Sequence, residues 1–192
     1  METKIQNLIC EIPTEDFIRR FVDIPRFFAC CEKCPGFGKT WACPPYDFDP
    51  LSVWQRFSSV MLYGKKLVIG ESLRQTRLDD EALSRTSYFL FDNARRALLE
   101  ELFTLERENT GSLALSAGGC SFCENCTRPQ GLPCRSPERM RFSVESLGGD
   151  VSKALRECFG IELKWAEEGR LPEYYVLLGA LLKKQLNHYL PN

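Results

Sequence analysis

Residues 78–108, LDDEALSRTSYFLFDNARRALLEELFTLERE, decide the fold because they carry the clearest periodicity in the chain. Apolar residues recur there at intervals of three and four, which is the spacing of one buried face of an α-helix. They are Leu78, Ala82, Leu83, Leu90, Ala94, Ala97, Leu98, Leu102 and Leu105. The pattern predicts a long helix from Leu78 to Glu108, and Gly111 is a typical residue to follow its end.

Shorter elements are expected on both sides of this helix. Runs of apolar and β-branched residues predict strands at 59–70, 113–116, 161–166 and 174–182, with a turn near Gly169 and Arg170 between the last two. Helices are expected at Thr14–Phe21 with Thr14 as the cap, after Asp49-Pro50, and at Val151–Cys158 before Gly160. Pro137–Arg141 predicts a helical turn. This order favours an α/β fold in which helices pack on a mixed, roughly four-stranded sheet.

Length and charge set the broad class of the protein. The 192 residues suit a single domain covering 1–192, and a net charge of -1 gives no reason to expect nucleic acid or an anionic membrane as a partner. No apolar signal region follows Met1, and the apolar run at 174–182 is far shorter than the ~20 residues of a membrane helix. We therefore expect a soluble, cytoplasmic protein.

Ten cysteines are the most unusual feature of the composition. In a reducing cytoplasm cysteines rarely form structural disulfides, so their close spacing indicates metal binding. The single histidine, His188, lies far along the chain from the cysteine clusters. Thiolates must therefore supply the ligands.

The second cysteine cluster, within a loop from Cys120 to Cys134, carries the more specific signal. Two residues separate Cys120 from Cys123 and Cys123 from Cys126, and Cys134 follows after seven more. Three thiolates at this spacing are typical of a cuboidal iron–sulfur cluster. Structural zinc sites more often combine two separate Cys-x-x-Cys pairs, so the run favours iron–sulfur over zinc.

The first cluster lies in a loop predicted for Cys30–Pro45. Cys31 and Cys34 are two residues apart, and Cys43 follows after eight more. A proline directly after Cys34 and after Cys43 stiffens the loop, and Gly36 lets the backbone pass close to a bound cluster. The candidate metal ligands of the two clusters are Cys31, Cys34, Cys43, Cys120, Cys123, Cys126 and Cys134.

The sharing of seven thiolates between two sites is open. Cys134 can stay with its own loop, or it can complete the site of Cys31, Cys34 and Cys43. The local arrangement is slightly favoured, because closing a short loop costs less entropy. Cys30 is adjacent to Cys31, and consecutive side chains rarely bind one ion. Cys10 and Cys158 have no partner nearby in sequence and are interpreted as small packing residues.

Three stretches of the sequence resemble the DUF2284 family, a group of cysteine-rich proteins predicted to bind metal. They are CEKCPGFGKTWACPP at 31–45, GCSFCENC at 119–126, and CRSPE at 134–138 followed by SVESLG at 143–148 and Val151. The resemblance extends from about residue 25 to 182 and implies metal binding without a general biochemical role. Phe37 and Ser136 depart from it, because tyrosine and histidine are common there. Ser136 excludes a histidine ligand at that position.

We therefore expect an iron–sulfur protein of the [4Fe-4S] type, with one or two clusters, that transfers electrons or supports a redox partner protein. Two alternatives stay open: a structural zinc-binding interaction module, and an enzyme with an open-site iron–sulfur cluster. Arg135, Arg139 and Arg141 form a small basic group beside the second cluster that could dock an acidic partner. No catalytic triad or carboxylate pair stands out, so no catalytic residue is assigned.

Overall fold

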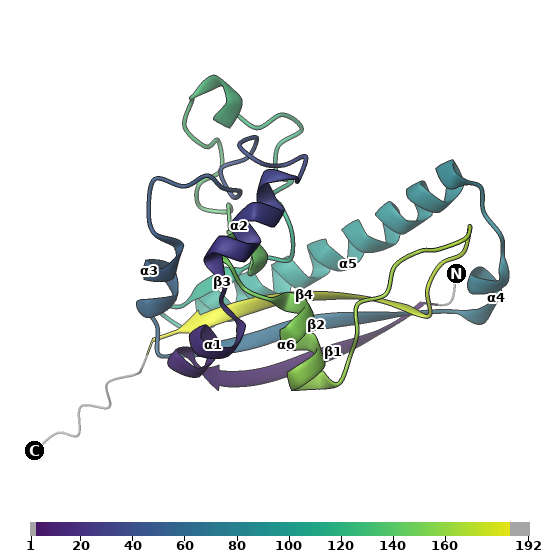
Figure 1. The fold of residues 1–192 in the computed structure, drawn as a ribbon, viewed down its shortest axis with the longest axis horizontal. Helices are drawn as coiled ribbons and strands as arrows, with labels where there is room; N and C mark the ends of the chain where they lie inside the picture. The colour runs from purple at the N-terminus through teal and green to yellow at the C-terminus, as the bar shows by residue number, and fades with distance from the viewer. Residues whose placement is uncertain (1–2, 185–192) are drawn as a thin grey trace, which may run out of the picture.

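One four-stranded sheet forms the centre of the protein in the computed structural model, which describes residues 3–184. Its strands are β1 (Thr3–Pro13), β2 (Ser59–Ile69), β3 (Leu113–Leu115) and β4 (Tyr174–Lys183). They lie in the order β1-β2-β4-β3, and all three pairings are antiparallel (Figure 1). The predicted α/β class with a four-stranded sheet is confirmed, and the sheet itself is antiparallel throughout.

Six α-helices surround the sheet in the described residues. They are α1 (Thr14–Phe21), α2 (Ile24–Glu32), α3 (Pro50–Gln55), α4 (Glu71–Gln75), α5 (Asp80–Glu108) and α6 (Val151–Phe159). Helix α5 is the predicted long helix, and the Asp79 carboxylate caps it by accepting from the Ala82 amide at 2.7 Å. Two short 3-10 turns, η1 (Arg128–Gln130) and η2 (Glu145–Leu147), lie in the C-terminal half.

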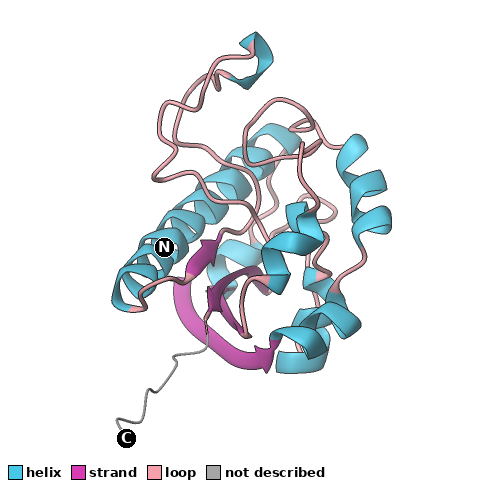
Figure 2. Cartoon of the chain, turned by 90° about the vertical axis from the view of Figure 1, so that its left-hand side faces the viewer, coloured by secondary structure: helices cyan, strands magenta, loops and turns pink. Residues whose placement is uncertain are grey.

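Helices cover both faces of the sheet, which creates two apolar clusters. On β4, Val176, Leu178 and Ala180 face a cluster shared with α1, α3 and α6. Leu177 and Leu181 face a second cluster shared with α5, on the opposite side (Figure 2). A strand buried on both faces reads as a continuous apolar run, which explains why the sequence of β4 shows no polar alternation.

The predicted strand at 161–166 is wrong, and the fourth strand is β1 instead. Residues 161–166 pair with no strand of the sheet, although β3 covers only Ala180–Leu182 on the second edge of β4. The predicted turn beyond that segment is present, because Glu167 and Arg170 exchange backbone hydrogen bonds of 3.1 and 2.9 Å. β1 escaped prediction because it is an edge strand with an exposed face.

Two predictions near the N-terminus also need correction. The predicted cysteine loop at Cys30–Pro45 begins inside α2, so Cys30 and Cys31 are helical. The Asp23 carboxylate starts this helix by accepting from the Arg26 amide at 3.1 Å. The cap position of α1 is Pro13, and the Thr14 hydroxyl is buried without a partner among the described residues, so Thr14 is not the cap.

The remaining predictions place short features around the sheet. Asp49 caps α3, and Gly160 ends α6 in a left-handed conformation, as predicted. Residues 137–139 form a turn, with the Met140 amide donating to the Ser136 carbonyl at 2.9 Å.

In residues 3–184, no helix has both the length and the apolar character needed to cross a membrane. His188 lies outside the described residues.

Candidate metal centre

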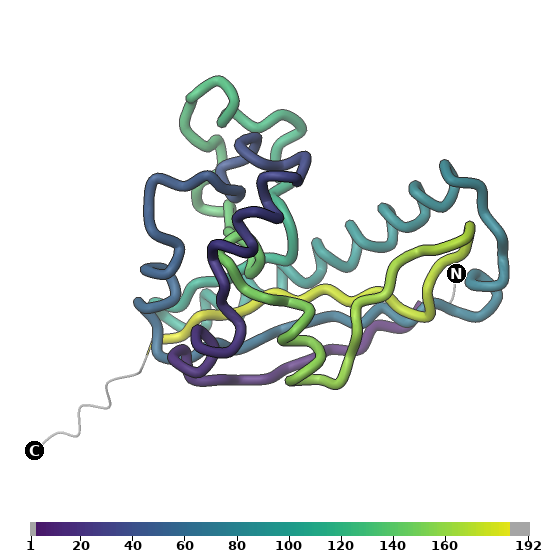
Figure 3. The backbone as a smooth tube through the Cα atoms, in the orientation of Figure 1, coloured from purple at the N-terminus to yellow at the C-terminus, as the bar shows by residue number. Residues whose placement is uncertain are grey.

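The two cysteine-bearing segments come together at one end of the molecule, and we call residues 30–46 and 117–142 the cysteine lobe. Figure 3 shows these segments beside each other, beyond the sheet and next to α2. The Trp41 indole N–H donates to the Leu132 carbonyl at 3.1 Å, which confirms direct contact between them. Residues about 90 positions apart in the sequence therefore form one unit.

Arg128 makes the strongest connection between the two segments. Its guanidinium donates to the carbonyl oxygen of Thr40 at 2.7 Å and also to those of Cys43 and Pro45. The same group lies over the Trp41 ring, with its central carbon 5.5 Å from the ring centroid. Charge-assisted hydrogen bonds are stronger than neutral ones. One side chain of the second segment thus fixes the backbone of the first around Cys43.

Helix α5 supports the second segment at both ends. Arg95 donates to the Gly119 carbonyl at 2.6 Å and to the Ser121 hydroxyl at 2.5 Å. At the other end Arg141 pairs with Glu106 at 2.5 Å, and these side chains are only 14% and 15% exposed. The second segment therefore begins and ends on a rigid helix, although it contains little regular structure itself.

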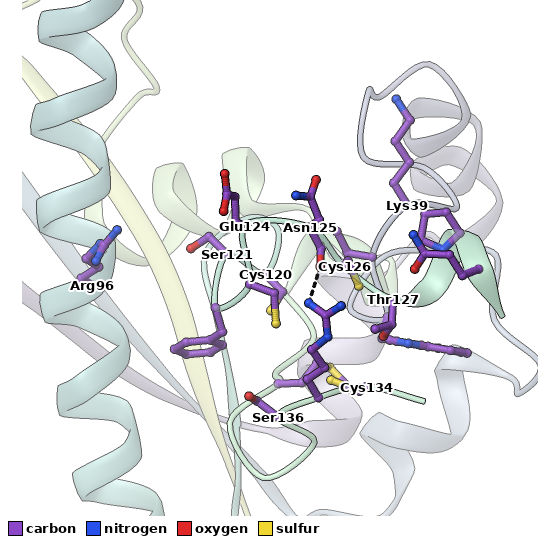
Figure 4. Close-up of a pocket in the computed structure, with 18 of the residues that line it drawn as sticks. Lys39, Arg96, Cys120, Ser121, Glu124, Asn125, Cys126, Thr127, Cys134 and Ser136 are labelled. Carbon is purple, nitrogen blue, oxygen red and sulfur yellow. Dashed lines mark hydrogen bonds between the residues drawn. The ribbon is translucent and has the colours of Figure 1, made fainter. Parts of the chain in front are cut away.

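The second cysteine group consists of Cys120, Cys123, Cys126 and Cys134, which line one cavity of about 560 Å³. Figure 4 shows Cys120, Cys126 and Cys134 around this cavity, with Thr127 and Ser136 at its margin. Burial raises the pKa of the Cys120 thiol, and the other three thiols of the group add to the rise. The structure thus brings Cys134 together with the cysteines of its own loop.

The first cysteine group consists of Cys31 on the last turn of α2, Cys34 just after it, and Cys43. A Cβ atom at Gly36 would lie 3.5 Å from the Cys43 sulfur and 3.8 Å from the Cys34 sulfur. Burial raises the pKa of Cys31 to about 11, and the nearby thiols of Cys34 and Cys43 contribute to this shift. The three thiols therefore share one neighbourhood.

The two groups adjoin at Cys43. A Cβ atom at Gly119, the residue before Cys120, would lie 3.8 Å from the Cys43 sulfur. Because glycine has no side chain, the backbone of the second segment can run close to a sulfur of the first. The two groups are neighbours within the lobe, while Cys134 faces the cavity of the second group.

The donor chemistry of both groups fits a metal or an iron–sulfur cluster. The thiols of Cys31 and Cys120 resist ionisation chiefly because burial disfavours the thiolate, and in part because neighbouring thiolates repel one another. A bound cation offsets both effects. Thiolates are the soft ligands that zinc and iron–sulfur clusters prefer. Among residues 3–184, no three side chains of His, Cys, Asp or Glu already stand in coordinating geometry.

The structure adds residues that sequence reasoning missed. Arg128 bridges the segments, and the Glu145 carboxylate adds to the rise in the pKa of the Cys31 thiol, after burial and the neighbouring thiols. Cys10 on β1 and Cys158 on α6, which have no partner nearby in sequence, lie beside each other and pack against the core. Burial raises the pKa of Cys158 to about 11, and the Cys10 thiol adds to this. Only the short spacing between cysteines was visible in the sequence, and these contacts span much longer separations.

The predicted basic group has intramolecular partners at each position. Arg141 forms its ion pair with Glu106, and Arg139 lies over the Phe122 ring at 4.3 Å. Arg135, which lines the cavity, donates to the Asn125 carbonyl at 3.2 Å. These contacts give all three arginines a structural role within the cysteine lobe. Docking of an acidic partner on them stays a prediction.

Comparison with known proteins identifies the family of the chain. Neither curated proteins nor solved structures gave a significant match to the chain. The model of one protein family matches residues 20–182, and that family is described as predicted metal-binding protein (DUF2284). The match spans α2, the sheet from β2 onward and both cysteine groups. The chain therefore belongs to the DUF2284 family of predicted metal-binding proteins.

Proposed function

We propose that the cysteine lobe binds iron–sulfur clusters of the [4Fe-4S] type, one at each cysteine group, and that the protein transfers electrons or supports a redox partner protein. One observation carries this proposal. Four cysteines, three of them spaced by two residues, line a single cavity of about 560 Å³. Four thiolates at such spacing are the usual protein ligands of a cuboidal cluster.

The proposed ligands of the second site are Cys120, Cys123, Cys126 and Cys134. The first site uses Cys31, Cys34 and Cys43, which leaves one coordination position without a cysteine. When bound, a cluster supplies one-electron redox chemistry at these positions. The local placement of Cys134 is preferred because it faces the same cavity as the three cysteines of its loop.

Other residues of the lobe would set the properties of the second site. Trp41 lines the cavity and limits access of water, and its indole N–H bond to Leu132 keeps the ring in place. Arg135 also lines the cavity and brings a positive charge there. Such a charge favours the reduced, more negative state of a cluster and so raises its reduction potential.

Structural zinc binding is the second candidate function. The same four thiolates also satisfy a tetrahedral zinc site, which needs four ligands and no sulfide. A protein of this kind would present the lobe as a rigid interaction surface. The spacing of three cysteines by two residues favours the cluster over zinc. The three-cysteine first group would also suit an enzyme that binds substrate at an open iron position.

Metal analysis under anaerobic conditions tests the proposal. The full-length protein, reconstituted with iron and sulfide without oxygen, is expected to be brown and to contain iron and sulfide in similar amounts. Stoichiometric zinc without sulfide under the same conditions would contradict the cluster proposal and support the zinc alternative. Oxygen must be excluded throughout, because zinc can occupy thiolate sites that have lost a cluster.

A further inference from the structure

A second cavity, of about 420 Å³, adjoins the cavity of the second cysteine group. Most of its lining comes from α5 and from the segment 117–142, and Figure 4 shows Arg96 on α5 beside Ser121 and Cys120. Cys120 lines both cavities, so the second cavity lies directly beside a proposed metal ligand. The two cavities share four lining residues: Arg96, Cys120, Ser121 and Phe122.

Arginine side chains are concentrated around this second cavity. Four guanidinium groups line it, two from α5 and two from the end of the segment 117–142: Arg95, Arg96, Arg139 and Arg141. Like charges around one cavity repel one another, so their clustering costs free energy unless anions face them. A guanidinium group binds carboxylate and phosphate oxygens through paired N–H donors. The lining therefore has the chemistry of an anion site.

Asp92 is shared between two of these arginines, which leaves a positive charge unbalanced. It accepts from Arg95 Nη2 at 2.6 Å and from Arg96 Nε at 2.7 Å, and one carboxylate cannot neutralise two guanidinium groups. Arg95 has further acceptors in the other wall, at Gly119 and Ser121. Within residues 3–184, the exposed Arg96 side chain donates only from Nε, so its two terminal nitrogens can serve a ligand.

Arg139 has only a weak ionic partner. Its contact with Glu100, which also lines the cavity, spans 3.5 Å, and the two side chains are 51% and 65% exposed. Exposed ion pairs of this kind contribute little stability, so a better acceptor can take the place of Glu100. The Arg139 guanidinium stays at the cavity because its central carbon lies 4.3 Å from the centroid of the Phe122 ring.

The size and the apolar part of the wall indicate more than a simple ion. Leu99 and Phe122 line the cavity, and the Phe122 ring packs against Phe103 with the ring centroids 6.2 Å apart. Cavities of roughly 300–1,000 Å³ that combine apolar walls with a few polar groups are typical sites for small organic ligands. The lining therefore suits a ligand that has both a negatively charged group and an apolar part.

We propose that this second cavity binds a small organic anion, whose carboxylate or phosphate group pairs with Arg96 and Arg139 while its apolar part contacts Phe122. Arg95 and Arg141 hold the two walls in place, since both are mostly buried and paired with carboxylates. The inference adds a ligand site to the proposed metal sites of the lobe. It does not depend on which metal the cysteine groups bind.

Calorimetric titration of the full-length protein, reconstituted anaerobically with iron and sulfide, tests the inference. The probes are phenyl phosphate and benzoate, together with inorganic phosphate, which lacks the apolar part, and benzyl alcohol, which lacks the charge. Wild type is expected to bind one aromatic anion per chain, at least about tenfold more tightly than inorganic phosphate or benzyl alcohol. The tighter of the two aromatic anions identifies the charged group that the cavity prefers.

Single variants locate the site. Arg96→Gln and Arg139→Gln are each expected to weaken binding of the tighter probe by about tenfold or more, because each removes a charge-assisted hydrogen bond. Arg85→Gln is the matched control, since Arg85 is an exposed residue of the same helix that pairs with Glu81 at 2.9 Å and does not line the cavity. It should bind as wild type does. In wild type, saturating probe should also slow amide hydrogen exchange at residues 119–122, which locates the site without any substitution.

Other results would overturn the inference. Wild type that binds neither aromatic anion has no such site. Equal weakening in Arg85→Gln, or none in Arg96→Gln and Arg139→Gln, would place the anion elsewhere on the surface. Inorganic phosphate that binds as tightly as the aromatic anions would show an adventitious ion only. Metal analysis gives a separate result, because binding that persists in protein loaded with zinc would support the anion site even where the cluster proposal fails.

Discussion

The two cysteine groups of the lobe differ in how the chain assembles them. The second group takes four thiols from one segment of 15 positions, 120–134, that is anchored on α5 at both ends. The first group combines the last turn of α2 with the loop that follows it, and it brings together three thiols, those of Cys31, Cys34 and Cys43. The spacing of the cysteines therefore indicates a set of four thiols in the second group and only three in the first.

Removal of a single cysteine is the test of this comparison with the largest expected effect. Cys134→Ala is expected to damage the second cluster and to lower iron by up to about half, because that cluster loses one of its four thiolate ligands. The first cluster should survive, since Cys134 lines the cavity of the second group together with Cys120, Cys123 and Cys126. Iron analysis and paramagnetic resonance after reduction measure this, with Cys31→Ala as the matched variant. If both variants lose the same signal, Cys134 belongs to the first site instead.

Metal removal should affect the two segments unequally. Without metal, amide hydrogen exchange is expected to rise by about tenfold or more at 120–134, because that segment has little regular structure of its own. Residues around Cys31 should change less, since α2 keeps its backbone hydrogen bonds, and β2 and β4 should not change. Mass spectrometry of exchange in loaded and metal-free protein checks this. An equal rise in exchange at 120–134 and around Cys31 would contradict the proposed difference between the two segments.

The Arg128 contacts join the two groups, and their loss should destabilise both. Arg128→Met removes donors to the carbonyls of Thr40, Cys43 and Pro45, so we expect the free energy of unfolding to fall by about 3 kcal/mol. Urea unfolding of the loaded protein gives this value. Arg135→Met is the matched control, because Arg135 makes one bond, to the Asn125 carbonyl, and should cost much less. Similar losses in the two variants would show that Arg128 has no special role.

Cys10 and Cys158 lie outside both groups, and substitution of Cys158 should have the smallest effect of the changes considered. Cys158→Ala should leave metal content unchanged and lower stability by about 1 kcal/mol, because the thiol packs against the core. Burial, with the neighbouring Cys10, raises the pKa of Cys158 to about 11 from an ordinary 9.0. The folded state therefore holds this proton more tightly than the unfolded state.

Because the folded state holds this proton more tightly, the stability of the protein should fall at alkaline pH. Stability contributed by Cys158 is complete below about pH 9 and is lost as the pH rises to about 11. Thermal unfolding of wild type and Cys158→Ala across this range should show a decline in wild type that is smaller in the variant. Parallel declines would contradict the raised pKa. Loss of more than half of the iron in Cys158→Ala would instead make Cys158 part of a metal site.

The parts of the fold that could be predicted are those in which burial imposes a strong pattern. Helix α5 has one buried face, and β2 and β4 are central strands, so their apolar spacing is visible without the structure. Strand β1 lies at an edge of the sheet, and two of its apolar side chains are exposed: Ile5 at 46% and Ile9 at 60%. Its sequence therefore shows no clear alternation of buried apolar and exposed polar residues. The segment 161–166 resembles a strand in its residue types, but it pairs with no strand in the structure.

The site divides in the same way. Cysteine spacing pointed to the two groups, because ligands on one segment keep a fixed separation. Arg128 acts across the fold, and its sequence context does not distinguish it from an ordinary surface residue. The position of α2 was also missed, so Cys31 was expected in a loop although a helix end presents it. The role of Arg128 becomes evident only when the packing of one segment on the other is known.

The three carbonyl contacts of Arg128 have a consequence for the order in which the two cysteine groups bind metal. Arg128 belongs to the segment of the second group, while its acceptors belong to the segment of the first. Under the proposed function, loading of either site orders a backbone that the other site also needs. The first binding event then bears the entropic cost of ordering this backbone, and the second does not. The two metal affinities are therefore linked, and each site raises the affinity of the other by the same factor. Metal-free and doubly loaded molecules should accordingly outnumber those with a single cluster.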